Sequence, residues 1–118
     1  MVNLSAFIRF HAERTPDKAA VIYDDRSLAY AEMYNRIERV AAALAARGIG
    51  RGDVVAAVMK NSPAFLEIAF AASHLGAVFL PINFRLAADE VGYITDNAEA
   101  RLAFVDEEFT DVVPADLD

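Results

Sequence analysis

The chain has 118 residues, of which 56% are hydrophobic, and a net charge of −7 at neutral pH. This apolar content excludes a disordered or fibrous protein and predicts one globular domain, or part of a larger one. The negative charge is concentrated in residues 106–118, which hold six acids and no base, while Lys and Arg are scattered singly, so a nucleic-acid-binding surface is excluded.

The N-terminal region predicts a helix followed by a small hairpin. Apolar residues at helical spacing predict a helix from Asn3 to Arg14, and Pro16 prevents its continuation. Two short extended runs, Ala19–Tyr23 and Ser27–Tyr30, predict the strands of the hairpin. The turn between them consists of Asp24, Asp25 and Arg26.

A long helix and a buried strand are predicted next. Apolar residues form a stripe along a helix from Ala31 to Arg47. Gly48 is a suitable end for this helix, because glycine adopts the left-handed conformation without strain. The six consecutive apolar residues of Val54–Met59 predict a strand that is covered on both faces.

The second half of the chain alternates between helices and strands. Asn61 and Ser62 cap a helix that has Pro63 at its first position and ends at Gly76. The following elements are a strand at Val78–Ile82, a helix at Leu86–Asn97 and a strand at Arg101–Val105. This order predicts an α/β fold with a parallel three-stranded βαβαβ unit, preceded by the N-terminal helix and small hairpin.

The apolar stretch from Pro63 to Ile82 raises the question of a membrane span. Glu67, His74 and Pro81 interrupt it, so a buried helix followed by a buried strand explains it better than a transmembrane segment. The N-terminus has charged residues where a secretory signal needs an apolar core. Because the chain also lacks cysteine, we expect a cytoplasmic protein without disulfides.

Gly48, Gly50 and Gly52 do not predict a phosphate-binding loop. Such a loop places its glycines after a strand, so that amides at a helix N-terminus point at the anion. Here the glycines follow a helix and precede a strand, which predicts a tight turn instead.

Other catalytic and metal-binding patterns are absent from the sequence. His11 and His74 each lack a second ligand at metal-binding spacing, so we predict no metal site. Ser62 is typical of a helix cap and not of a nucleophile. Adjacent acids, as at Asp89–Glu90 and Glu107–Glu108, are typical of turns and first helical turns. We therefore predict no catalytic residue within this chain.

Arg85 is the one charged residue that the predicted topology singles out. It follows a buried strand, in the loop that opens a helix, at the carboxyl end of a parallel sheet, where open α/β folds bind their ligands. The alternative is a solvent-facing Arg85, or one that pairs with Asp89.

Motifs along nearly the whole chain resemble the adenylate-forming, AMP-binding superfamily. The strongest is the run Leu-Gly-Ala-Val-Phe-Leu-Pro-Ile-Asn-Phe-Arg-Leu at 75–86. The other similar segments, in order, are Thr15–Lys18, Leu28–Met33, Gly48–Val54, Asn61–Phe65, Glu90 and Asn97–Phe104. The sequence departs from the usual motifs at Ala29, where relatives have Thr, and at Ala87 and Ala88, where relatives often have Thr then Pro; losing such a cap typically costs about 1 kcal/mol.

The form of the segment Pro81–Leu86 is similar to fatty-acid and aryl-CoA ligases more than to peptide-synthetase adenylation domains. The resemblance implies a ligase that uses ATP, Mg²⁺ and coenzyme A: it converts a carboxylic acid to an acyl-adenylate and transfers the acyl group to CoA. It also implies that Arg85 lies near the CoA nucleotide, with Asn83 as a loop-shaping neighbour.

The same resemblance implies that residues 1–118 are the incomplete N-terminal portion of an AMP-binding domain. A Ser/Thr/Gly-rich phosphate loop ending in Lys-Gly is absent, so we expect that loop, the metal-binding Glu, the acyl pocket and the catalytic Lys beyond Asp118. The chain alone is then expected to be inactive, and either to need the remainder of its own chain as a partner or to self-associate. The alternatives are a self-contained flavodoxin-like binding or interaction module and a fragment of a peptide-synthetase-type adenylation domain.

Overall fold

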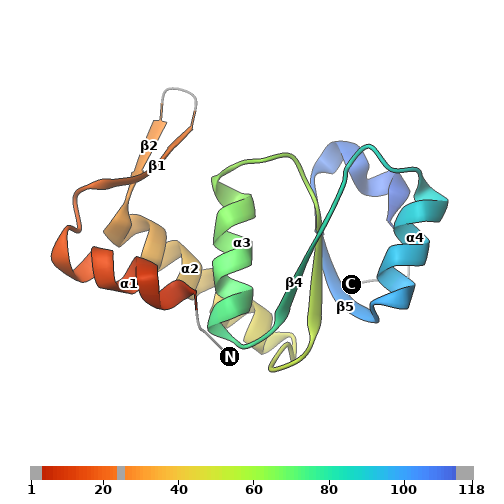
Figure 1. The fold of residues 1–118 in the computed structure, drawn as a ribbon, viewed down its shortest axis with the longest axis horizontal. Helices are drawn as coiled ribbons and strands as arrows, with labels where there is room; N and C mark the ends of the chain where they lie inside the picture. Colours follow the sequence, from red (N-terminus) through yellow and green to blue (C-terminus); the bar gives the residue numbers. More distant parts are fainter. Residues whose placement is uncertain (1–3, 24–25, 114–118) are drawn as a thin grey trace.

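The computed structural model describes residues 4–23 and 26–113, and its centre is a three-stranded parallel sheet (Figure 1). The strands are β3 (Val54–Val58), β4 (Val78–Ile82) and β5 (Ala100–Val105), in the order β4-β3-β5. The central strand β3 pairs in parallel with both neighbours, and Val55 lies opposite Phe79 on one side and Leu102 on the other. The predicted α/β class with a parallel βαβαβ unit is therefore confirmed.

Helices cover both faces of this sheet. On one face, α2 (Tyr30–Ala46) and α3 (Pro63–His74) pack over a cluster that includes Val55 and Leu102. On the other face, α4 (Ala88–Asn97) and the 3₁₀ helix η1 (Glu107–Val112) pack over a second cluster around Val58 and Val91. In β3, residues 55–58 have no exposed surface, as expected for a parallel strand that is covered on both sides.

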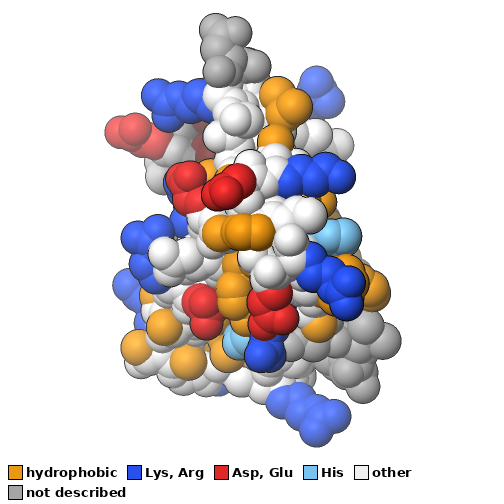
Figure 2. Space-filling model, turned by 90° about the vertical axis from the view of Figure 1, so that its left-hand side faces the viewer, with side chains coloured by type: hydrophobic (Ala, Val, Ile, Leu, Met, Phe, Trp, Pro, Cys, Tyr) orange, Lys and Arg blue, Asp and Glu red, His pale blue; other side chains and the backbone are white. Residues whose placement is uncertain are grey.

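The N-terminal helix and hairpin lie at one end of the molecule. Helix α1 (Ser5–Arg14) packs against α2, and the hairpin strands β1 (Ala19–Tyr23) and β2 (Arg26–Ala29) project away from the sheet (Figure 1). Figure 2 shows hydrophobic side chains at the surface of this end, interspersed with acidic and basic ones. Five large hydrophobic residues of α1, its flank and the hairpin are exposed: Leu4, Phe7, Phe10, Ile22 and Tyr23.

Most predicted boundaries are within two residues of the observed ones. Tyr30 begins α2 instead of ending the hairpin, and α4 begins at Ala88 because a turn occupies the residues before it, in which Leu86 N donates to Asn83 O at 3.1 Å. Three predicted features fall on residues outside the described ranges: the helix start at Asn3, the hairpin turn at Asp24 and Asp25, and the last part of the acidic segment, residues 114–118.

The acidic C-terminal segment contains the 3₁₀ helix η1, which packs on the sheet. Glu107 and Glu108 are exposed, but Phe109, Val112 and Val113 pack against the second hydrophobic cluster. The acids therefore form the outer side of a short helix whose apolar residues cover the sheet.

Glycine ends two of the helices, as the sequence indicates. Gly48 after α2 and Gly76 after α3 have φ values of +83° and +73°. In each case the next amide donates back into the helix, from Ile49 N to Leu44 O at 3.0 Å and from Ala77 N to Ala72 O at 2.9 Å. This is the Schellman pattern, which satisfies carbonyls at the end of a helix.

The glycine-rich turn before β3 closes the amino end of the sheet. Asp53 Oδ2 accepts hydrogen bonds from Gly50 N at 2.8 Å and from Arg101 Nη1 at 3.2 Å, and Arg101 Nη1 also donates to Gly48 O at 3.2 Å. The hydrogen bond from the Gly50 amide, assisted by Arg101, lowers the pKa of Asp53. The glycines thus form a tight turn between a helix and a strand, as predicted. The hydrogen bonds of Arg101 to Asp53 and Gly48 connect that turn to β5.

We expect Gly76→Ala to destabilise the chain by about 1–2 kcal/mol, because an alanine at φ +73° adopts the left-handed conformation at a steric cost. The matched control is Gly50→Ala, which lies in the neighbouring turn at an ordinary φ with open space around an added Cβ. Urea denaturation measures the free energy of unfolding of both variants. Equal stabilities of the two variants would show that the left-handed cap of α3 is not needed.

Candidate functional site

The carboxyl ends of the three parallel strands meet at one edge of the sheet, and the loops there form the candidate site. Lys60 follows β3, Asn83 to Arg85 follow β4, and Asp106 to Phe109 follow β5. Arg85 therefore lies at the edge where open α/β folds bind ligands, as the topology predicted.

Backbone and carboxylate contacts join the loops after β3 and β5. Asp106 N donates to Val58 O at 3.1 Å, and Lys60 N donates to Asp106 Oδ2 at 2.9 Å. Lys60 Nζ also forms an ion pair with Glu108 Oε1 at 2.9 Å. These contacts hold the start of η1 beside the end of β3.

Asn83 shapes the loop that carries Arg85. Its side-chain Oδ1 accepts a hydrogen bond from Arg85 N at 2.9 Å, and its backbone O accepts one from Leu86 N at 3.1 Å. This is the local turn in which Asn side chains commonly imitate a backbone acceptor.

At the start of α4, the Glu90 side chain caps the helix. Glu90 Oε1 accepts a hydrogen bond from Ala87 N at 3.1 Å, which is one of the two hydrogen bonds of a capping box. The second is missing because Ala87 has no side-chain oxygen.

Two aromatic rings and two cations lie close together in the site. Phe84 stacks on Phe109 with ring centroids 5.1 Å apart and an angle of 25° between the planes. The guanidinium of Arg85 lies 4.9 Å from the centre of the Phe84 ring, and Lys60 Nζ lies 5.9 Å from that of Phe109. Each of the two stacked rings thus has a positive group near it.

The two cations differ in whether a carboxylate neutralises their positive charge. Lys60 is paired with Glu108, whereas within residues 4–23 and 26–113 no carboxylate forms an ion pair with Arg85. Asp89, the partner considered for Arg85 in the sequence, forms no such pair with it. Arg85 and Asn83 are both exposed. The loop after β4 therefore presents an exposed positive charge next to an aromatic ring, which suits an anionic ligand with a planar ring.

Asn83 and Arg85 were predicted as site residues from the sequence, whereas Lys60 and Phe109, which the structure places beside them, were not. Lys60 comes directly after one predicted strand of the sheet, and Phe109 lies four residues after the end of another, which is the signal that could have pointed to them. The histidines lie elsewhere: His74 Nδ1 is 2.9 Å from Ser5 Oγ, and His11 stacks on Tyr30.

No group of three or more acidic or histidine side chains is placed to hold a metal ion within the described ranges. Across those same residues, no helix has the length and apolar character needed to cross a membrane.

The family of AMP-binding enzymes matches residues 8–118 of the chain. A fatty acid–(acyl-carrier-protein) ligase, ScoC from Streptomyces coeruleorubidus, is 39% identical over 104 residues, which are 88% of this chain and 20% of the relative. An indoleacetate–CoA ligase from Aromatoleum aromaticum is 36% identical over 114 residues, which are 97% of this chain and 22% of the relative.

The fold also matches a solved structure, the inhibitor-bound N-terminal domain of FACL13 from Mycobacterium tuberculosis. The TM-score is 0.89 at 35% sequence identity, over 95% of this chain and 29% of the solved chain. The chain thus spans about a fifth of the length of the curated relatives that it matches.

Proposed function

The chain belongs to the AMP-binding enzyme family, and on this premise we propose that residues 1–118 form the N-terminal portion of an ATP-dependent acid–thiol ligase. The whole enzyme activates a fatty or aryl acid as an acyl-adenylate and transfers the acyl group to coenzyme A. The observation that carries the proposal is the family match over residues 8–118, supported by relatives that are themselves named as ligases.

The proposed reaction has two steps. An oxygen of the substrate carboxylate attacks the α-phosphorus of ATP, which forms the acyl-adenylate and releases pyrophosphate. The sulfur of CoA then attacks the acyl carbonyl carbon, which forms the thioester and releases AMP. Mg²⁺ neutralises phosphate charge in such reactions, and in the proposal its ligands lie outside the described residues, which hold no suitable cluster.

The choice of CoA as acceptor rests on the form of residues 81–86. The names of relatives include both CoA and acyl-carrier-protein ligases, so the acceptor has to be tested directly. Nothing in the comparisons favours a flavodoxin-like module or a peptide-synthetase fragment. Cytoplasmic localisation remains a prediction from the sequence.

The test of this function is acid-dependent release of pyrophosphate from ATP, measured for the full-length protein of this gene with a panel of fatty and aryl acids. We expect release with at least one acid, and thioester formation when CoA is added. Residues 1–118 alone should release none, because no phosphate-binding loop is present in their sequence. Turnover by the 118-residue chain unaided would contradict the proposal.

We assign the loop after β4 to the CoA nucleotide. Arg85 is exposed and has no ion-pair partner among the described residues, so its charge is available to a phosphate group. The Phe84 ring lies beside this guanidinium and stacks on Phe109, so it supports the loop that carries the charge. Asn83 acts in this proposal through its hydrogen bond to the Arg85 amide, which holds the loop.

In the full-length enzyme, we expect Arg85→Ala to raise the KM for CoA about tenfold, which corresponds to about 1.4 kcal/mol, while adenylate formation is unchanged. The measurement compares CoA-dependent thioester formation with acid-dependent pyrophosphate release. Arg9→Ala, at an exposed arginine of α1, is the matched control and should change neither. An equal loss of both half-reactions in Arg85→Ala would assign Arg85 to folding instead.

We also propose that the 118-residue chain self-associates through its exposed apolar surface. Phe7 on α1 and Ile22 on the hairpin are 61% and 76% exposed, and both elements lie at the same end of the molecule (Figure 1). Large apolar side chains exposed to water favour association.

Replacing both residues, as Phe7→Ser with Ile22→Ser, should shift the weight-average mass of the 118-residue chain towards the monomer. Light scattering coupled to size exclusion measures this mass. Tyr93→Ser, at a residue of α4 that is 71% exposed, is the control and should leave the mass unchanged. A wild-type chain that is monodisperse and monomeric would refute self-association.

A further inference from the structure

The ring of Phe109 connects η1 to the loop after β4. It stacks on Phe84 with ring centroids 5.1 Å apart, and both residues are half-buried. Both also pack against the second hydrophobic cluster, so the stack is continuous with the core on that face of the sheet. Phe84 directly precedes Arg85, whose guanidinium lies 4.9 Å from the centre of the Phe84 ring. A side chain of η1 therefore contacts the residue next to the exposed charge.

The position of Phe109 is set from the central strand of the sheet. Phe109 N donates to Asp106 O at 2.9 Å, and Asp106 N donates to Val58 O at 3.1 Å. Lys60, which follows β3, donates from its amide to Asp106 Oδ2 and forms an ion pair through Nζ with Glu108. These contacts hold the backbone of η1 at the end of β3, and none of them involves the loop after β4.

The hydrogen bonds of the loop after β4 are local by comparison. Asn83 accepts from Arg85 N through its side chain and from Leu86 N through its backbone. These bonds set the shape of the turn, but they do not fix the turn relative to the neighbouring strands. The stack of Phe84 on Phe109 does so, because it joins residues from two different loops.

We propose that Phe109 is a positioning residue for the CoA nucleotide, which acts through Phe84 to hold the Arg85 guanidinium where it binds phosphate. An arginine that is held in place before the ligand arrives loses less conformational freedom on binding than an arginine on a free loop. The inference rests on the proposed function, in which Arg85 binds the CoA nucleotide. It extends the binding site to η1, which follows a different strand.

The test uses four variants of the full-length protein of this gene. Phe109→Leu removes the ring but keeps an apolar side chain, and Phe109→Tyr keeps the ring. Arg85→Ala, alone and combined with Phe109→Leu, shows whether Phe109 acts through Arg85. The KM for CoA is measured from thioester formation, and acid-dependent pyrophosphate release measures adenylate formation in the same samples.

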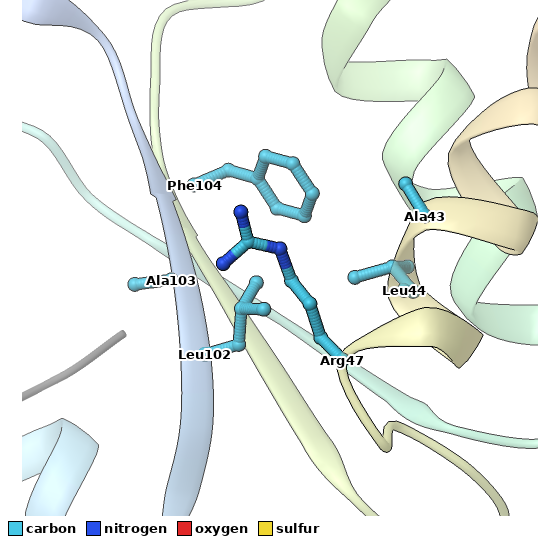
Figure 3. A pocket seen from close by; sticks show the side chains of 6 residues that line it. All are labelled: Ala43, Leu44, Arg47, Leu102, Ala103 and Phe104. Atoms are coloured by element: carbon cyan, nitrogen blue, oxygen red, sulfur yellow. The ribbon is translucent and has the colours of Figure 1, made fainter.

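Phe104→Leu is the matched control, because it makes the same change five residues earlier in the chain. Phe104 is also half-buried, but it packs against the first hydrophobic cluster and not the second. Figure 3 shows its ring between β5 and α2, where it lines a cavity of about 340 Å³ together with Arg47. The control thus removes a phenylalanine ring near an arginine on the face of the sheet away from Phe84.

We expect Phe109→Leu to raise the KM for CoA about threefold, in line with the usual contribution of an aromatic pair, while pyrophosphate release is unchanged. Phe109→Tyr and Phe104→Leu should both keep the wild-type KM. In the Arg85→Ala background, Phe109→Leu should cause no further rise, because the charge that the ring positions is already absent. If Phe109→Leu does not fold, Phe109→Met takes its place with the same expectation.

A wild-type KM in Phe109→Leu, next to a raised KM in Arg85→Ala, would overturn the inference and leave the proposed function standing. Equal rises caused by Phe109→Leu with and without Arg85 would also overturn it, because Phe109 would then act by another route. A parallel loss of pyrophosphate release would assign Phe109 to folding instead. An unchanged KM in Arg85→Ala would refute the nucleotide assignment and this inference together, while continued pyrophosphate release would preserve the ligase function.

Discussion

Complete burial of β3 is the constraint on which the rest of the structure depends. A strand whose residues 55–58 have no exposed surface needs a parallel neighbour on each edge and a helical layer on each face. The chain meets both needs by returning through α3 to β4 and through α4 to β5. Because all three strands run in the same direction, their carboxyl ends lie at one edge, which brings Lys60, Arg85 and Phe109 together from distant parts of the sequence.

Patterns of residues close together in the sequence account for most of the helices and strands that were predicted correctly. The bounds of β4 were predicted without error, and the Ser62–Pro63 pair placed the start of α3, where Ser62 Oγ accepts from Phe65 N. Gly48 and Gly76 marked the ends of α2 and α3, because few other residues adopt positive φ readily. These features depend on residues within one turn of each other, so a single segment contains the information.

Features that depend on contacts between distant segments were not predictable in the same way. The ion pair of Lys60 with Glu108 and the stacking of Phe84 on Phe109 join residues from different loops, and no local pattern encodes them. The acidic composition of η1 gave no indication of its packing, because its three acids accompany apolar residues that contact the sheet. Glu99 at φ +55° was also unexpected, since a glycine would serve better at the end of α4.

The two ends of the sheet are built differently. At the amino end, Arg101 and Asp53 join the turn before β3 to the start of β5, so the loops there are cross-linked by charged groups. At the carboxyl end, the loop after β4 contacts its neighbours through stacked rings, which tolerate sliding better than directional hydrogen bonds do. Ring contacts therefore hold the loop after β4 in place, whereas hydrogen bonds and an ion pair hold the turn at the opposite end of the sheet.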